Sequence, residues 1–309
     1  MRLLTRRRFA AASVFGTVCP AHPSQSSSEQ PAFRSTTSLV LLEVSVFDLH
    51  GVPVAGLEKS DFQVKESGRP RRISHFSTGA GQVSVGLVVD LSRSMRARQA
   101  AVASAAAQFS AQLQPADELF FVLFNESILV ESPPKPLTAL TPAEVASIVA
   151  SAPCDGQTAL YDAVLKGADL ARNSAHARRV LVVLSDGADT ASKSSWSDTL
   201  AAIQASNLLI YTVGIRADGG EPGAPGVLRR LAETTGGFAV FNPDPASLPA
   251  FFQRVVSDLR ARYVLGYQAV EPTAGRTETR ALRVNILNPA IRNVRIRTRK
   301  QYRIQAAGV

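Results

Sequence analysis

The chain has 309 residues, of which 45% are hydrophobic, and its formal net charge is +9. This length exceeds what a single hydrophobic core usually fills, so the chain has room for two domains, and the composition is that of a soluble globular protein. After residue 21 no apolar run approaches the roughly 18 residues of a membrane-spanning helix, so we expect no transmembrane span in the mature chain.

The N-terminus has the order of an export signal. Four arginines within the first eight residues precede the apolar run Ala10–Val18, and small or turn-forming residues follow through Ala21. The stretch Thr5-Arg6-Arg7-Arg8-Phe9 is similar to the twin-arginine signal, although an ordinary secretory signal with extra arginines has the same order. We favour a twin-arginine signal over residues 1–21 and expect a protein of the periplasm, the cell envelope or the medium.

Residues 22–36 are polar and low in complexity, which is typical of a flexible linker. Once the signal is removed, Cys154 is the only cysteine left, so no intramolecular disulfide can form. The stability of the mature chain must therefore come from buried cores.

Short strands are predicted in the two flanks, and alternating strands and helices between them. The N-terminal β segment, 37–80, predicts strands over Leu39–Asp48, Phe62–Glu66 and Arg72–Phe76. In the middle of the chain, 82–261, the pattern predicts strands at Val83–Val89, Leu119–Phe124, Val180–Leu184, Leu208–Ile215 and Phe238–Phe241. It also predicts helices at Ala100–Leu113, Trp196–Ala205, Val227–Thr235 and Leu248–Arg260, and two more that begin at Pro142 and at Leu160. The C-terminal β segment, 262–305, predicts strands at Tyr263–Gln268, Leu282–Leu287 and Val294–Arg297.

This order predicts an α/β fold whose doubly wound, mostly parallel sheet is flanked by short β segments. Each flank alone has too few strands to be stable in water. Pooled, the flanks would form a small β-sandwich with the α/β domain inserted between its halves. The alternative is that each flank packs separately on the α/β domain.

Positive charge is concentrated near the C-terminus, where nine Lys or Arg and one acid, Glu278, lie between Arg276 and Arg303. Such a strip can meet nucleic acid, anionic lipid or another polyanion. It can equally be the solvated face of alternating strands, as in Arg295-Ile296-Arg297-Thr298-Arg299. We favour the solvated face and expect no nucleic-acid partner.

The strand Val83–Val89 is followed by Asp90-Leu91-Ser92-Arg93-Ser94, with three oxygen-bearing side chains at alternate positions. One carboxylate and two hydroxyls can converge on a hard cation such as Mg²⁺. Taken alone, the motif also fits a capped turn in which Ser94 caps the next helix. Asp186 follows another predicted strand, and ligands of such sheets bind beyond the carboxyl ends of the strands.

The middle region resembles the von Willebrand factor type A (VWA) domain and its metal-ion-dependent adhesion site (MIDAS). The matching positions are Asp90, Ser92, Ser94, Thr158 and Asp186. The resemblance implies that the two serines bind Mg²⁺ (or Mn²⁺) through their hydroxyls, that Thr158 binds it directly or through water, and that the two aspartates mostly hold metal-bound waters. It also implies a protein partner that offers a Glu or Asp carboxylate. The flanks resemble the VWFA-related domain family described from Acidobacteria, in Val46–Val54 and Tyr263–Tyr267 among other phrases.

We therefore expect a metal-dependent binding protein and not an enzyme. A structural envelope protein, in which the metal only stabilises loops, is the first alternative. A metal-dependent hydrolase is the second, but no general base is evident near the motif, since the histidines His22, His50, His75 and His176 lie outside it. We expect Asp162 and Asp189 to serve helix ends and turns, and Cys154 to be a bystander, because Mg²⁺ avoids sulfur.

Overall fold

The computed structural model describes residues 37–79, 81–215, 224–241, 245–272 and 276–305. The predicted signal, 1–21, and linker, 22–36, lie outside these residues. No helix in the described ranges combines the length and apolar character that crossing a bilayer demands.

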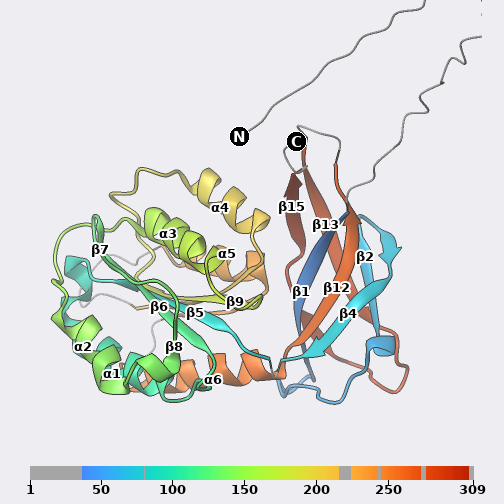
Figure 1. The fold of residues 1–309 in the computed structure, drawn as a ribbon, viewed down its shortest axis with the longest axis horizontal. Helices are drawn as coiled ribbons and strands as arrows, with labels where there is room; N and C mark the ends of the chain where they lie inside the picture. Colours follow the sequence, from blue (N-terminus) through green and yellow to red (C-terminus); the bar gives the residue numbers. More distant parts are fainter. Residues whose placement is uncertain (1–36, 80, 216–223, 242–244, 273–275, 306–309) are drawn as a thin grey trace, which may run out of the picture. The chain divides into compact units, whose positions relative to one another are not determined.

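The middle of the chain forms a seven-stranded sheet in the order β11-β10-β9-β5-β6-β7, with β8 also paired to β6 (Figure 1). Its strands are β5 (Ser84–Asp90), β6 (Glu118–Phe124), β7 (Ile128–Glu131), β8 (Lys135–Pro136), β9 (Arg179–Ser185), β10 (Leu208–Gly214) and β11 (Ala239–Phe241). Strands β11, β10, β9, β5 and β6 run parallel, whereas β7 and β8 are antiparallel to β6. Every residue of β5, β6 and β10 is buried, as expected for strands covered on both faces.

Helices cover both faces of this sheet (Figure 1). They are α1 (Gln99–Ser110), α2 (Pro142–Ser151), α3 (Leu160–Arg172), α4 (Trp196–Ala205), α5 (Pro225–Thr235) and α6 (Leu248–Ala261), with 3₁₀ helices η2 (Arg93–Arg98), η3 (Leu137–Ala139) and η4 (Pro245–Ser247). Helices α1, α2 and α6 pack on the sheet through one hydrophobic core, and helices α3, α4 and α5 pack on it through another. Thr141 caps α2 by accepting a hydrogen bond from the amide of Glu144, and Pro142 occupies the first helical position. The doubly wound, mostly parallel α/β fold is confirmed.

The strand order reverses at β5. The chain leaves β5 through α1 to β6 on one side and later returns through α3 to β9 on the other. In open α/β sheets this topological switch point leaves a crevice beyond the carboxyl ends of the strands. Asp90 ends β5, and Asp186 follows the last residue of β9.

The two flanks combine into two antiparallel four-stranded sheets, ordered β14-β1-β12-β4 and β15-β13-β2-β3. Their strands are β1 (Thr37–Phe47), β2 (Phe62–Glu66), β3 (Arg69–Arg71), β4 (Ile73–Thr78), β12 (Tyr263–Val270), β13 (Thr277–Ile286), β14 (Arg295–Arg297) and β15 (Gln301–Gln305), with the 3₁₀ helix η1 (Lys59–Asp61) before β2. One hydrophobic core, drawn from both flanks, lies between the sheets. The expected β-sandwich is confirmed, since both sheets contain strands from before and after the α/β domain.

A buried polar network joins the end of α6 to the β-sandwich. Arg262, the single residue between α6 and β12, is fully buried and donates to Asp258 Oδ2 at 2.7 Å and to the Gly236 carbonyl at 2.7 Å. Asp258 also accepts from Ser45 Oγ, at 2.9 Å, and from Arg297 Nη2, at 2.5 Å. Burial alone raises the pKa of Asp258, but the charges of Arg262 and Arg297 outweigh it and lower that pKa below its usual value.

The solvated face expected for residues 295–299 is wrong for Arg297 and Arg299. Arg297 lies over the rings of Phe47 and Phe238, with its Cζ 4.8 and 5.0 Å from their centroids, and pairs with Asp258. Arg299 is buried and donates to the Leu41 carbonyl at 2.7 Å and to the Ser206 carbonyl at 3.0 Å. These side chains face buried carboxylate and carbonyl oxygens instead of water, and alternation along a strand cannot reveal such partners.

Replacing Gly237 by alanine is expected to destabilise the protein by about 1–3 kcal/mol or more, because overpacking forces the backbone to move. A Cβ at this position would lie 1.9 Å from the Ile210 carbonyl oxygen. Urea unfolding checks the result. The matched control is Gly226→Ala in α5, where a Cβ meets nothing within 4 Å, so a gain of roughly 0.5–1 kcal/mol is expected. Equal stability of the two variants would contradict the close packing of Gly237.

Candidate metal site

Three loops meet beyond the carboxyl ends of the parallel strands. The first runs from Asp90 into η2, the second joins α2 to α3 and contains Thr158, and the third follows β9 and begins with Asp186. Backbone bonds join the first two loops, since the Arg93 amide donates to the Gly156 carbonyl at 3.2 Å.

Asp90 is fully buried, and both of its carboxylate oxygens accept hydrogen bonds. Oδ1 accepts from the Ser92 amide at 2.8 Å, and Oδ2 accepts from Ser185 Oγ at 2.6 Å. Burial raises the pKa of Asp90 to about 6, although the bonds from Ser185 and Ser92 act in the opposite direction. No described Lys, Arg or His forms an ion pair with Asp90 or with Asp186. A buried carboxylate without a countercharge is costly, and a bound cation would offset this cost.

The side chains of Ser92, Ser94 and Asp186 form a chain of close oxygens. Ser92 Oγ lies 3.1 Å from Ser94 Oγ, and Ser94 Oγ donates to Asp186 Oδ2 at 2.9 Å. The other carboxylate oxygen of Asp186 accepts from the Ala188 amide at 3.0 Å, which fixes its orientation. Ser94 therefore does not cap the helix that follows, because its hydroxyl is directed to Asp186.

Thr158 lies against the third loop through its backbone. Its amide donates to Thr190 Oγ1 at 3.1 Å, and its carbonyl accepts from the amides of Thr190 and Ala191 at 2.8 and 3.0 Å. The residue is buried, but no hydrogen bond in the described part of the chain joins its hydroxyl to Asp90, Ser92, Ser94 or Asp186. The structure thus joins Ser92, Ser94 and Asp186 through side-chain contacts, links Asp90 to the backbone amide of Ser92, and places Thr158 in the adjoining loop.

Two neighbours of the site act as supports. Ser185, which the sequence analysis missed, holds Asp90 and also accepts from the Gly187 amide at 3.0 Å. The only feature of the sequence that could have indicated this role is the position of Ser185 directly before Asp186. Gly187 has a φ of +86°, and a Cβ there would lie 2.7 Å from the Ala224 carbonyl oxygen, so this turn requires glycine.

The other polar neighbours have structural partners. Cys154 Sγ donates to the Ser92 carbonyl at 3.3 Å, and burial, with the charge of Asp90, raises the pKa of the thiol to about 11. Asp162 accepts from the amides of Lys193 and Ser194, and Asp189 accepts from the Tyr161 amide at the start of α3. These contacts are the turn and helix-end roles expected of the two aspartates.

Two arginines stand at the rim of the site. Arg93 Nε donates to Asp155 Oδ1 at 2.8 Å, and Arg96 Nη2 lies 3.1 Å from Asp155 Oδ2. All three side chains are more than half exposed, so these ion pairs stabilise the fold little. Two arginines share one aspartate, so the three side chains of Arg93, Arg96 and Asp155 together carry a net positive charge.

The oxygens of the site fit a hard divalent cation. Mg²⁺ binds six oxygens at about 2.0–2.1 Å in an octahedron, so neighbouring ligand oxygens lie about 3 Å apart. The Ser92–Ser94 and Ser94–Asp186 separations, 3.1 and 2.9 Å, match that edge. Within the described residues there is no group of three or more His, Cys, Asp or Glu that could hold a metal ion, so a cation here would depend on hydroxyl ligands. Such a donor set suits Mg²⁺ or Mn²⁺ better than metals that prefer sulfur or imidazole.

Loops of this kind, at the switch point of a parallel sheet, define a class of α/β ligand-binding domains. The model of the von Willebrand factor type A domain matches residues 84–254, more than half of the chain, so the chain belongs to this family. None of the curated proteins matches the chain. The resemblance of the flanks to the VWFA-related family of Acidobacteria stays a prediction.

Solved structures share the fold at low sequence identity. A von Willebrand factor type A protein from Catenulispora acidiphila is 15% identical with a TM-score of 0.50, and the match covers 89% of this chain and 75% of that one. The pilus adhesin SpaC from Lactobacillus rhamnosus GG is 10% identical with a TM-score of 0.49, covering 80% of this chain and 48% of that one. Proximal thread matrix protein 1 from the mussel byssus, solved with a zinc-occupied MIDAS motif, is 15% identical with a TM-score of 0.48, covering 64% and 50%. At such identities the likeness is one of fold alone.

Proposed function

We propose that this protein binds a protein partner through a divalent cation, Mg²⁺ or Mn²⁺, held by Asp90, Ser92, Ser94, Thr158 and Asp186. The observation that carries the proposal is the buried Asp90, which pairs with no Lys, Arg or His of the described ranges, beside oxygens whose separations of 2.9 and 3.1 Å match an octahedral edge. When bound, the cation supplies a Lewis-acid position for a Glu or Asp carboxylate of the partner. The chain contributes ligands that are largely neutral, and this leaves the cation electrophilic.

A purely structural metal explains the loops less well. The Arg93–Gly156, Cys154–Ser92 and Thr158–Thr190 bonds already join the three loops without a cation. A site with three hydroxyls among its ligands also holds a cation less tightly than a set of carboxylates would. These two features favour capture of an external ligand over stabilisation of the loops.

The residues around the site favour binding over hydrolysis. Asp90 is fully buried with both oxygens hydrogen-bonded, which suits a positioning group and not a nucleophile. His176 bonds to the Ala116 carbonyl before β6, at the opposite end of the sheet, and His50 and His75 belong to the sandwich segment before the α/β domain. His22 lies outside the described residues.

The rim charges support an acidic partner. Arg93 and Arg96, both exposed, place two guanidinium groups at the rim next to the proposed cation, with Asp155 and Glu126 as the neighbouring carboxylates. Electrostatic complementarity of this kind accelerates association with an acidic surface. We place the interaction in the cell envelope or outside the cell, on the basis of the predicted export signal over residues 1–21.

Retention of partners from a cell-envelope extract is expected to require both Mg²⁺ and the site. The immobilised protein is compared in Mg²⁺ and in EDTA, alongside the variants Asp90→Ala and Asp186→Ala. The matched control is Asp169→Ala, an exposed aspartate of α3. A partner retained only by the parent chain and by Asp169→Ala, and only in Mg²⁺, supports the proposal, and changing its critical acid to the amide must abolish retention. Identical proteins retained under all conditions would contradict it.

A further inference from the structure

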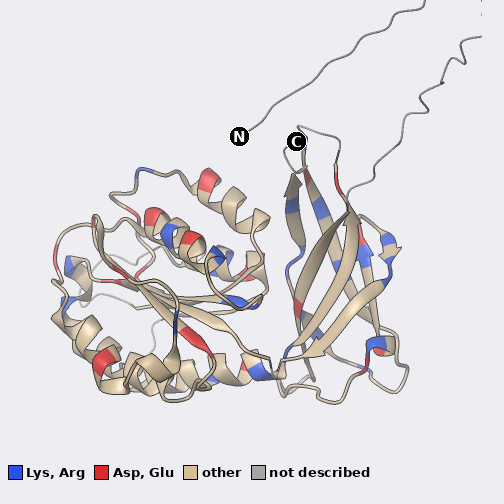
Figure 2. Ribbon diagram, viewed as in Figure 1, with Lys and Arg blue, Asp and Glu red and all other residues tan. Residues whose placement is uncertain are grey.

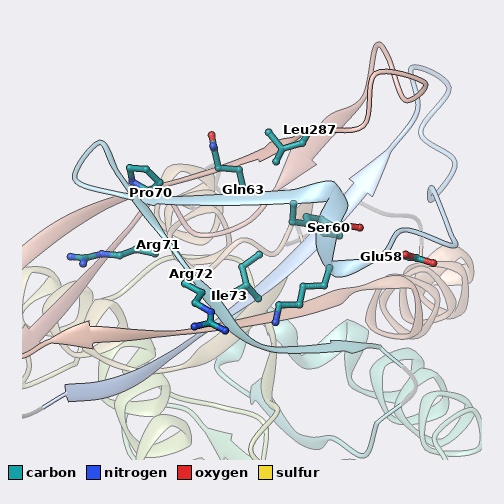
Figure 3. Close-up of a pocket in the computed structure, with 10 residues that line it drawn as sticks. Glu58, Ser60, Gln63, Pro70, Arg71, Arg72, Ile73 and Leu287 are labelled. Atoms are coloured by element: carbon teal, nitrogen blue, oxygen red, sulfur yellow. The ribbon is translucent and has the colours of Figure 1, made fainter.

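A second candidate binding surface lies on the β-sandwich, on the strands that precede the α/β domain. An open cleft with a volume of about 570 Å³ crosses the start of β2 and the passage from β3 to β4 (Figure 3). Gln63 and Leu287 lie on one side of β2, and Arg72 and Ile73 lie on the other (Figure 3). The volume is within the range of ligand sites, roughly 300–1,000 Å³.

The cleft has an apolar base. Phe62 and Ile73 belong to the sandwich core and are exposed by only 4% and 6%, so they form a firm floor. Leu287, on the rim, is 54% exposed, and Pro70 is also exposed. An apolar side chain of a ligand would shield this rim from water.

The polar part of the lining is dominated by cations. The lining contains three cationic side chains, Lys59, Arg71 and Arg72, and one carboxylate, Glu58. Among the described residues, the side chains of Lys59 and Arg72 make no hydrogen bond and no ion pair. Arg71 pairs with the buried Glu66 through Nη2, while its buried Nε lacks a hydrogen-bond partner in the described part of the chain. The exposed side chains of Lys59 and Arg72 are therefore the donors that the cleft offers to an anionic ligand.

Positive charge continues from the cleft onto the outer face of the same sheet. Gln63 and Lys65 alternate with the inward residues of β2, and Lys65 lies directly opposite Arg283 of β13. Like charges directly opposite each other destabilise a sheet. The outward positions of β2, β13 and β15 in the described ranges hold no carboxylate. A bound anionic segment would relieve the repulsion between Lys65 and Arg283. Figure 2 shows Lys and Arg in blue on these strands.

The edge strand next to the cleft is protected from pairing with another strand. Pro70, in the middle of the edge strand β3, has no N–H to offer, and such prolines protect edges from strand addition. A ligand would therefore be held by side chains, through charge and apolar contact.

We propose that this cleft, with Lys65 and Arg283, is a metal-independent docking site for an acidic segment of a partner protein that carries an apolar side chain. The cations bind the carboxylates, and the apolar side chain covers Leu287 and the floor of the cleft. A nucleic acid fits less well, because single strands need exposed aromatic rings for base stacking, and the only aromatic residue of the lining is the buried Phe62. The site is separate from the proposed metal site and does not depend on it.

The test uses the full chain in EDTA and fluorescence polarisation of a short labelled peptide in which glutamates flank a central pair of leucines. Arg72→Glu and Lys59→Glu are each expected to weaken binding by about tenfold, since reversing a rim charge replaces attraction by repulsion. Added salt must weaken binding as well. Both residues are exposed, so these variants should fold, and circular dichroism verifies it.

The control variant is Arg230→Glu, which makes the same charge change on an exposed residue of α5. It must bind like the parent chain, and a peptide with glutamine in place of glutamate must bind far more weakly. Three results would each overturn the proposal: an equal loss in Arg230→Glu, equal affinity for the glutamine peptide, or displacement of the peptide by oligothymidylate at lower concentration than by unlabelled peptide. Because EDTA is present throughout, peptide binding in this test does not depend on the metal site, and the two proposals can fail independently.

Discussion

Mn²⁺ is expected to bind the Asp186→Ala variant at least about tenfold more weakly than the parent chain, because groups that hold metal ligands or metal-bound water carry this much affinity. Asp186 Oδ2 is 2.9 Å from Ser94 Oγ, so its removal takes away both a negative charge and the partner that orients that hydroxyl. Isothermal titration calorimetry with Mn²⁺ measures the change directly. Ser94→Ala should produce a loss of the same order.

Asp169→Ala provides the matched control, since it removes an equal charge from an exposed position on α3. Its affinity for Mn²⁺ should equal that of the parent chain. Unchanged affinity in both Asp186→Ala and Ser94→Ala would place the ion elsewhere on the protein and refute the ligand set.

Thermal unfolding provides a second measurement of metal binding at the same site. A ligand that binds only the folded state stabilises it by about 2.7 kcal/mol at a hundred times its Kd. Mg²⁺ should therefore raise the melting temperature of the parent chain, and EDTA should reverse the change. In Asp186→Ala, where the ion binds more weakly, the same Mg²⁺ concentration should raise the melting temperature by clearly less than in the parent chain.

The placement of Asp90 and Asp186 at one end of the sheet could be predicted from local patterns, whereas their role as metal ligands stays a prediction. Asp90 and Asp186 follow strands whose continuous apolar runs mark them as buried, and parallel strands bring such ends to one sheet edge. The support from Ser185 could not be predicted, since a serine at a strand end has no distinctive pattern. Its bond to Asp90 depends on the pairing of β5 with β9, which the local sequence does not specify.

The flanks illustrate the same limit. Strands β1, β2 and β12 were predicted because their residues alternate or form short strand-like runs. Strands β3 and β15 were missed, because one has three residues with a central proline and the other overlaps the end of the basic strip. The burial of Arg297 and Arg299 depends on partners, such as Asp258 and the Leu41 carbonyl, that are remote in sequence. Long-range pairing of charges leaves no local signal.

Replacing Asp258 by alanine is expected to lower the free energy of unfolding by about 3–5 kcal/mol, because it leaves a buried charge without its partner. Arg262 is fully buried, and among the described residues it would retain only carbonyl and phenol oxygens as acceptors, from Gly236, Glu43 and Tyr211. Arg297 would also lose its carboxylate. Urea unfolding measures the loss. Glu131→Ala, which breaks the exposed pair with Lys166, is the control and should cost no more than about 1 kcal/mol.

The double variant Asp258→Leu with Arg262→Met distinguishes a buried charge from lost packing. If the cost of Asp258→Ala comes from the unpaired guanidinium, the double variant should be less destabilised than the two single changes added together. Strict additivity would contradict this explanation.

Arg260, next to this network, bonds to the Gly81 carbonyl before β5, at the end of the sheet opposite Asp90. Mn²⁺ affinity of the folded variants should therefore equal that of the parent chain, so the network stabilises the junction and leaves the metal site unaltered.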